Sequence, residues 1–301
     1  MSVLVVGSVA FDSIRTPSGH EENILGGSAT YFSLTASFFT PVNVVAVVGE
    51  DFTEEHQRVF QGRTIHTAGI EHAPGRTFRW SGEYTENMNE AKTLDTQLNV
   101  FEHFSPKIPP AYLDSQVVFL GNIHPSLQLH VREQMPSAQL VALDTMNFWI
   151  KTTPDELKKT LTKVDLLMAN EGEAYMLSGC HNIRKAAACI QKLGPRMVVI
   201  KRGEYGVIMF MNDLMFSVPA YPLEEVHDPT GAGDSFAGGF VGYLGRAAEF
   251  SETHLRRAMV YGSVMASFTV EDFGLKRILR LTPGEIDTRF REFKTLTHFD
   301  V

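Results

Sequence analysis

The stretch from Asp228 to Asp234, with the sequence DPTGAGD, combines residue types that suit the transfer of a phosphoryl group. Its proline disfavours a helix interior, whereas Phe236 and Phe240 recur afterwards at helical spacing, so we predict a helix that starts near Gly231. The first amides of a helix lack intrahelical acceptors and carry the positive end of the helix dipole. A helix start without large side chains therefore predicts a site for an anion such as phosphate.

Asp234 would repel a phosphate held by the neighbouring amides, so its carboxylate is better suited to act as a general base. It would take the proton from a hydroxyl group that attacks phosphorus, while the amides of Gly231, Ala232 and Gly233 stabilise the charge on the transferred group. The structural alternative is that the glycines only permit close packing and that Asp234 is an acid favoured by the helix dipole. The predicted chemistry is phosphoryl transfer to an alcohol.

Apolar runs of strand length alternate with helical stretches along much of the chain. They cover residues 3–6, 43–48, 117–120, 140–143, 165–169 and 197–201. Such runs are typical of parallel strands buried on both faces and joined by right-handed crossovers. We therefore predict an α/β fold, a Rossmann-like αβα sandwich with a mostly parallel central sheet. Ligands bind beyond the carboxyl ends of such strands, where Asp12, in the loop after the first run, could accept hydrogen bonds from a polyol.

Residues 76–104 have a different pattern. Phe78 and Trp80 flank a polar residue, and Leu94, Leu98 and Val100 also alternate with polar residues. Period-two alternation is typical of strands with one solvated face. Together with a short strand within residues 13–25, this segment predicts a small β-sheet lid that excludes water from the substrate. The alternative is an antiparallel edge of the main sheet.

Three further elements are expected. Ser28 is a candidate cap for a helix over residues 28–38, Asn212-Asp213 predicts a hairpin between strands at 207–211 and 215–218, and Thr282-Pro283 starts a closing helix over residues 281–293.

The stretch from Asp228 to Asp234, followed by small residues and Gly238-Gly239, resembles residue for residue the C-terminal signature of the ribokinase-like (PfkB) family of carbohydrate and nucleoside kinases. Further motifs in the family's order extend the resemblance over nearly the whole chain, as one kinase domain over residues 1–301. It implies a kinase that uses ATP and Mg²⁺ to phosphorylate a hydroxyl group, with Asp228 among the cofactor-binding residues.

The resemblance also assigns residues to the acceptor. Residues 7–12 resemble the first motif of the family, in which the aspartate, here Asp12, holds sugar hydroxyls. Gly26 and Gly27 resemble the di-glycine between the lid and the main domain. Many members have an asparagine four residues further on that contacts the sugar, whereas this chain has Tyr31.

Other motifs resemble the nucleotide side of the family's site. Asn170 and Glu173 match the Asn-x-x-Glu motif, and Glu173 could hold Mg²⁺ through water, although the pair would equally form a helix cap. Lys201, Gly203 and Gly206 resemble the Thr-x-Gly-x-x-Gly nucleotide loop, with lysine in place of threonine. That lysine either pairs with a phosphate or is a strand-end cation. Asp144 and Asn147 resemble the Asp-x-Asn loop, and residues 266–274 resemble the stretch that helps to line the adenine pocket.

Composition narrows the class of protein. The 301 residues carry a net charge of −8, which argues against a nucleic-acid or anionic-membrane partner. The chain shows no signal-peptide pattern and has two cysteines, so we expect a cytoplasmic protein without a disulfide scaffold. A homodimer through the lid is a further expectation from the resemblance.

The acceptor is the least determined feature. We place a sugar ahead of a nucleoside, because Tyr31, Phe32, Phe78 and Trp80 could stack on a nucleobase but have the spacing of core aromatics. Two alternatives are a non-catalytic member of the family and a dinucleotide-dependent dehydrogenase. The second is disfavoured because Gly7 opens no Gly-x-Gly-x-x-Gly motif.

Overall fold

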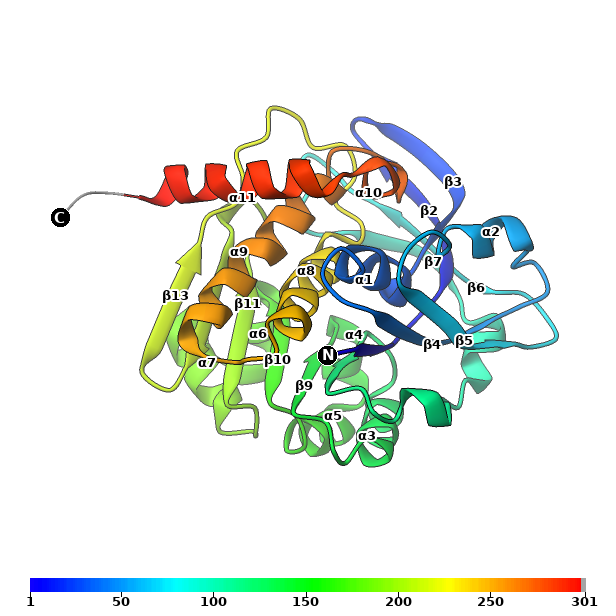
Figure 1. The fold of residues 1–301 in the computed structure, drawn as a ribbon, viewed down its shortest axis with the longest axis horizontal. Helices are drawn as coiled ribbons and strands as arrows, with labels where there is room; N and C mark the ends of the chain where they lie inside the picture. The colour runs from blue at the N-terminus through cyan, green and yellow to red at the C-terminus, as the bar shows by residue number, and fades with distance from the viewer. Residues whose placement is uncertain (299–301) are drawn as a thin grey trace.

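The computed structural model describes residues 1–298, and in this part of the chain the strands form two sheets (Figure 1). The larger sheet has the order β13-β12-β11-β10-β9-β8-β1-β4-β5. Its strands are β1 (Val3–Val6), β4 (Val42–Val48), β5 (Ile65–His72), β8 (Val117–Leu120), β9 (Leu140–Asp144), β10 (Leu166–Asn170), β11 (Met197–Lys201), β12 (Val207–Met211) and β13 (Leu214–Val218). All pairs from β5 to β11 are parallel, and β12 and β13 continue the sheet antiparallel. The predicted α/β sandwich with a mostly parallel sheet is confirmed.

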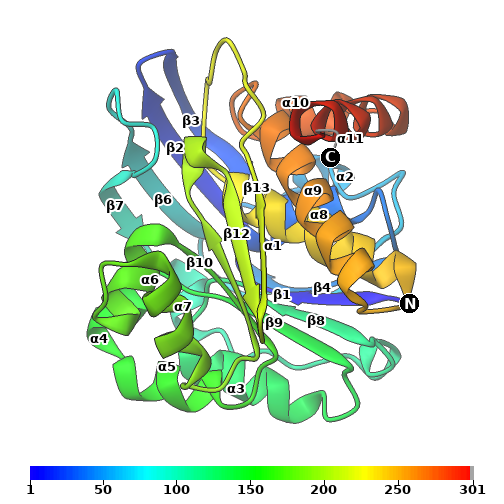
Figure 2. The ribbon, with the colours of Figure 1, turned by 90° about the vertical axis from the view of Figure 1, so that its left-hand side faces the viewer.

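Helices cover both faces of this sheet (Figure 2). They are α1 (Ser28–Ala36), α2 (Glu54–Arg58), α3 (Pro125–Gln134), α4 (Asn147–Thr152), α5 (Pro154–Leu161), α6 (Glu171–Ser178), α7 (Ile183–Gln191), α8 (Ala232–Ala247), α9 (Glu252–Thr269), α10 (Lys276–Arg280) and α11 (Pro283–Thr297), with short 3₁₀ turns η1 (Asn99–His103), η2 (Pro110–Tyr112) and η3 (Gly203–Tyr205). Helices α1, α8 and α9 lie on one face and α3 to α7 on the other. Among residues 1–298, no helix is both long and apolar enough to span a bilayer.

The central strand β1 shows why the apolar runs fold in this way. Val3 and Val5 pack into the core on the α8 side, whereas Leu4 and Val6 pack into the core on the α3 and α5 side. All four side chains are fully buried, and each contributes ~1.5–3 kcal/mol relative to an exposed position. A continuous apolar run is therefore required wherever helices cover both faces of the sheet.

The smaller sheet is separate from the main one and has the order β3-β2-β6-β7. Its strands are β2 (Ala10–Thr16), β3 (Gly19–Gly26), β6 (Phe78–Glu83) and β7 (Lys92–Gln97). The alternative of an antiparallel edge on the main sheet is therefore wrong. We call this sheet the lid. Asp51, in the loop after β4, fixes its base, because its carboxylate accepts hydrogen bonds from Thr77 N at 2.8 Å and from Arg79 Nη2 at 2.8 Å.

Three local predictions are wrong. Asp12 lies within β2 rather than in a loop, because the chain enters the lid soon after β1. Gly27, not Ser28, occupies the cap position of α1, and the Ser28 hydroxyl instead accepts from Ser8 N at 3.1 Å. Strand β7 ends at Gln97, so Val100, whose side chain is buried, belongs to η1 and not to an alternating strand.

Several other elements are confirmed. The hairpin of β12 and β13 turns at Asn212, which has φ +50°, and α11 begins after Thr282, whose side chain and that of Glu285 form a reciprocal cap.

Candidate active site

The start of α8 has the geometry that the glycine-rich stretch predicts. Gly231 is the cap residue with φ +75°, and Asp234 lies half-buried in the first turn. A Cβ atom on Gly231 would overlap the ring of Tyr31, so only glycine fits this position. Ala232 N donates to Pro229 O at 3.2 Å, whereas the amides of Gly231 and Gly233 have no main-chain acceptor within residues 1–298. The predicted anion hole therefore has two free amides, not three, because the amide of Ala232 already donates to Pro229 O.

Lys201 lies directly over this helix start. It is the last residue of β11, and a Cβ atom added to Gly233 would lie 3.0 Å from its Nζ. The same Nζ is 2.9 Å from Oδ2 of Asp144, at the end of β9. Burial lowers the pKa of Lys201, but the carboxylates of Asp144 and Glu173 outweigh burial and raise it, so the ammonium group is charged. The structure thus places a positive charge beside the anion hole.

Asp234 shares this edge of the sheet with two other acids. Its pKa is raised to about 7 by burial and by the negative charge of Asp144, against the opposing effect of Lys201. Burial, together with Asp144, also raises the pKa of Glu173 to about 7. A base with a pKa near neutrality is ionised in roughly half of the molecules at pH 7 and accepts a proton readily when ionised. This suits the predicted role of Asp234.

Asn170 and Glu173 form the predicted cap at the start of α6. Glu173 N donates to Asn170 Oδ1 at 2.8 Å, and Asn170 N donates to Glu173 Oε2 at 2.7 Å. The cap uses Oε2 of Glu173, and Oε1 accepts no hydrogen bond from the described residues. The structural alternative is therefore correct for the pair, and it leaves one carboxylate oxygen for a further ligand.

Asp12 is buried within β2 of the lid, close enough to Asp228 and Asp234 to be affected by their charges. Burial raises its pKa to about 7, the amide of Gly27 opposes that rise, and the negative charges of Asp228 and Asp234 add to it. Gly26 is in contact with this carboxylate, because a Cβ atom on Gly26 would overlap it. Gly27 has φ +93° and lies against Ser8 O. The predicted acceptor residues Asp12, Gly26 and Gly27 are thus brought together near Asp234.

Tyr31 and Asp228 take positions that the sequence does not reveal. The ring of Tyr31 packs on Gly231, its side chain is 1 % exposed, and its hydroxyl has no hydrogen-bond partner within residues 1–298. The fully buried carboxylate of Asp228 accepts from Thr230 N at 2.9 Å and from Gly274 N at 3.0 Å. Asp228 therefore shapes the loop before α8, and direct contact with a nucleotide is not its visible role.

The loop after β11, which we predict to bind the nucleotide, contains η3, where Gly203 has φ +54° and Gly206 has φ +84°. The loop between β6 and β7 reaches it: Asn89 Oδ1 accepts from Glu204 N at 3.2 Å. In the same lid segment, Tyr84 Oη accepts from Thr230 Oγ1 at 3.3 Å. Sequence reasoning missed both lid residues. Tyr84 has the same period-two spacing as Trp80, and this spacing could have placed it on the same face of the lid. No sequence pattern points to Asn89.

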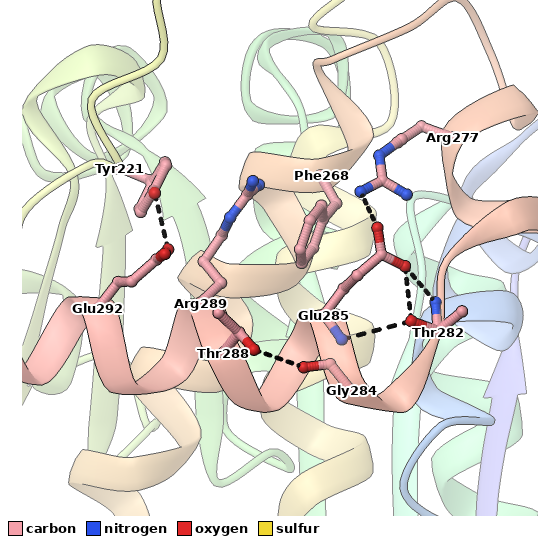
Figure 3. Close-up of a pocket in the computed structure, with 9 residues that line it drawn as sticks. All are labelled: Tyr221, Phe268, Arg277, Thr282, Gly284, Glu285, Thr288, Arg289 and Glu292. Carbon is pink, nitrogen blue, oxygen red and sulfur yellow. Dashed lines mark hydrogen bonds and ion pairs between the residues drawn. The ribbon is translucent and has the colours of Figure 1, made fainter.

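One cavity in the described part of the chain lies away from these residues. It has a volume of about 410 Å³ and lies between α9, α10 and α11 (Figure 3). Its lining is Tyr221, Phe268, Arg277, Thr282, Gly284, Glu285, Thr288, Arg289 and Glu292. The arginines are paired with acids, as in the contact of 2.7 Å between Arg277 and Glu285. Only Phe268 belongs to the stretch 266–274, and none of the predicted catalytic residues lines the cavity, so the chemistry is assigned to the sheet edge.

Among residues 1–298, no group of three or more His, Cys, Asp or Glu side chains is arranged to hold a metal ion by itself.

The family model described as pfkB family carbohydrate kinase matches residues 2–280. The chain belongs to this family of kinases, which transfer a phosphoryl group to an alcohol.

Three known proteins illustrate the similarity. A cytidine kinase of Thermococcus kodakarensis is 28 % identical over 259 residues, which cover 84 % of this chain and 91 % of that protein. A nucleoside kinase of Burkholderia thailandensis, solved in complex with inosine, superposes with a TM-score of 0.78 at 18 % identity over 99 % of this chain and 100 % of that one. The aminoimidazole riboside kinase of Salmonella enterica, solved with aminoimidazole riboside and an ATP analogue, has a TM-score of 0.75 at 18 % identity, with 96 % of this chain and 100 % of that chain covered.

Proposed function

We propose that this kinase transfers the γ-phosphoryl group of ATP to a hydroxyl group of a nucleoside, with cytidine as the first candidate. The observation that carries the reaction is the start of α8, where Asp234 adjoins open amides and the charge of Lys201. The nucleoside is favoured over the free sugar that the sequence alone placed first, because the similarity to a cytidine kinase extends over most of both chains.

In the proposed reaction, Asp234 accepts the proton of the acceptor hydroxyl as that oxygen attacks the γ-phosphorus. The amides of Gly231 and Gly233 and the ammonium group of Lys201 stabilise the charge on the transferred phosphoryl. Asp12 and the main chain at Gly26 and Gly27 hold other hydroxyl groups of the acceptor. Closure of the lid over the acceptor would keep water away from the phosphoryl group.

The acids at the sheet edge fit a role for Mg²⁺. Asp144 raises the pKa of both Glu173 and Asp234, a repulsion that a dication would relieve. Mg²⁺ usually binds one or two carboxylates together with substrate phosphates and keeps several waters. Glu173, through Oε1 and water, would hold the ion on the nucleotide side, together with Asn170. When bound, the ion neutralises charge on the nucleotide phosphates.

The decisive experiment measures ADP release from ATP with cytidine, other nucleosides, pentoses, hexoses, keto-deoxy acids and no acceptor. We expect release that depends on a nucleoside and on Mg²⁺. If a free sugar alone supports turnover, the nucleoside assignment is wrong and the kinase assignment holds. If ligands bind but no acceptor releases ADP, the protein is the non-catalytic member considered above.

Two further proposals concern the cellular location and the oligomeric state of the protein. We propose that the protein works in the cytoplasm and forms homodimers through the lid, whose edge strand β7 is exposed along all six of its residues. An unpaired strand edge of this kind favours pairing with a second copy. Sedimentation of the intact protein tests the dimer.

A further inference from the structure

Four aromatic side chains are candidates to face an acceptor ring: Tyr31, Phe32, Phe78 and Trp80. Three of them already have aromatic or backbone partners. The ring of Tyr31 packs on Gly231, Phe32 is buried and stacked on Phe119 at 4.4 Å between centroids, and Phe78 stacks on Phe101 at 5.2 Å. Trp80 is different, because its side chain is half-exposed and lies in the lid.

Strand register places Trp80 beside the acceptor residues. β2 and β6 are parallel, and Asp12 pairs directly with Trp80. Paired residues point to the same face of a sheet, and neighbouring strands are about 4.8 Å apart. Tyr84, which lies on the same face as Trp80 because residues alternate, reaches Thr230 in the loop before α8. Trp80 therefore belongs to the face of the lid that is turned towards the reacting groups.

The indole ring of Trp80 packs against Gly82 on this face. A Cβ atom on Gly82 would overlap the six-membered ring of Trp80, so the ring covers Gly82. Its Nε1 donates to Thr93 Oγ1 at 3.3 Å, and Thr93 is the strand partner of Gly82. The glycine leaves room for the ring, and the hydrogen bond fixes its orientation. One side of the indole is thus packed against the lid, and the half-exposed side chain leaves part of the ring open to a ligand.

We propose that the outward face of Trp80 stacks on the planar base of the acceptor and makes this residue a determinant of nucleoside over free sugar. The proposal rests on the proposed function, since only a nucleoside acceptor has a base that Trp80 could contact. Asp12 would hold the sugar hydroxyls while its strand neighbour holds the ring. Stacking on an aromatic side chain accepts any base, because every base has a π-face.

Kinetics of three variants test the proposal. Trp80→Leu should raise KM for cytidine about tenfold or more and leave kcat within about threefold, because stacking acts on binding. Trp80→Phe should restore most of the loss, since an aromatic face remains. Trp149→Leu, the same change at the other tryptophan, which lies in α4, should leave KM unchanged.

Fluorescence gives a readout that a merely structural role would not change. The chain has two tryptophans, so in Trp149→Phe the emission comes from Trp80 alone. Cytidine should quench this emission with a saturable curve, and ribose at the same concentrations should not.

The two levels of the proposal fail in different ways. If nucleosides are phosphorylated but Trp80→Leu keeps its KM for cytidine and cytidine does not quench the emission, the stacking role is wrong and the nucleoside kinase stands. If the wild-type protein phosphorylates no nucleoside, the proposed acceptor is wrong and this inference fails with it. Equal loss in Trp80→Leu and Trp80→Phe, with lowered melting temperatures in both, also contradicts stacking and indicates a structural role.

Discussion

At the scale of single residues, the edge of the main sheet and the neighbouring lid strand β2 bring together acids that would repel one another if all were ionised. Asp12, Glu173 and Asp234 each have a pKa raised to about 7, with burial as the largest cause. Lys201 is the cation that offsets this repulsion, through its contact with Asp144. The repulsion between these acids lowers the free energy of unfolding, and their raised pKa values make them reactive at neutral pH.

Removal of the base should abolish most of the activity. We expect Asp234→Asn to lower kcat by ~10²–10⁴, because an amide cannot accept the proton of the acceptor hydroxyl. ATP affinity, measured by calorimetry, should stay within about threefold. Asp287→Asn, at an exposed position of α11, is the control and should keep full turnover. Unchanged kcat in Asp234→Asn would exclude this residue as the base.

The raised pKa of Asp234 also predicts how activity depends on pH. The base works only when ionised, and its ionised fraction grows as pH rises through about 7. We therefore expect kcat/KM to climb between pH 6 and 8 with an apparent pKa near 7, a value that belongs to the coupled acids together. A rate profile that is flat over this range would contradict the assignment.

The contribution of Asp234 to the stability of the fold should change with pH in the opposite direction to its effect on activity. The pKa of Asp234 is about 7 in the folded protein and 3.8 as the reference value, so the folded state binds more protons between these pH values. Its contribution to the free energy of unfolding falls as pH rises from about 4 to 7. Asp234→Asn should therefore raise Tm by roughly 1–2 °C at pH 8, the shift expected for about 1 kcal/mol in a chain of 301 residues. The gain should be smaller at pH 5, and a lower Tm at pH 8 would show that the carboxylate stabilises the fold.

At the scale of elements, the start of α8 depends on the fit between Gly231 and Tyr31. The left-handed conformation with φ +75° and the packed ring leave no room for a side chain. Gly231→Ala should cost at least ~1–2 kcal/mol from conformation alone and should also lower kcat by tenfold or more, because the anion hole is displaced. Gly284→Ala is the matched control, since a Cβ atom there meets nothing within 4 Å. Thermal melts and initial rates of both variants check this, and equal effects would contradict it.

The strands of the main sheet could be predicted because burial on both faces demands continuous apolar runs, as at 117–120 and 197–201, whose bounds are those of β8 and β11. The lid gave a weaker signal. All residues of β7 are exposed, so packing does not fix where its alternating pattern ends, and Val100 was assigned to the strand although it is buried in η1. The sequence places Asp12 in a loop, whereas it lies within β2. No glycine or proline near Asp12 marks where the lid strand begins.

At the scale of the whole molecule, the site is built from segments that are distant in the sequence. Asp144 and Lys201 are 57 residues apart, and Asn89 and Glu204 are 115 apart. Motifs predicted which residues meet at the sheet edge because the carboxyl ends of parallel strands converge there. Side-chain pairs between such segments follow no period in the sequence, which is why the Lys201–Asp144 pair and the contact of Asn89 were not predictable.

Asn89 contacts the loop after β11, to which we assign the nucleotide, and this contact predicts that the two ligands bind cooperatively. The lid carries Asp12, which we assign to the acceptor, and its β6–β7 loop is hydrogen-bonded to Glu204 beside Gly203. A nucleotide that orders this loop should favour the closed lid, so a non-hydrolysable ATP analogue should tighten acceptor binding about fivefold or more. Because coupling is reciprocal, the acceptor should tighten analogue binding by the same factor.

Calorimetric titration of each ligand, with and without the other, measures this factor. Asn89→Ala should reduce the coupling by up to about fivefold, the worth of a hydrogen bond of about 1 kcal/mol. Glu86→Ala, an exposed change in the same loop, should leave it intact. Coupling that survives in Asn89→Ala at its wild-type value would show that the lid closes over the acceptor without sensing the nucleotide. In that case the two ligands would communicate only through direct contact of their own reacting groups at Asp234.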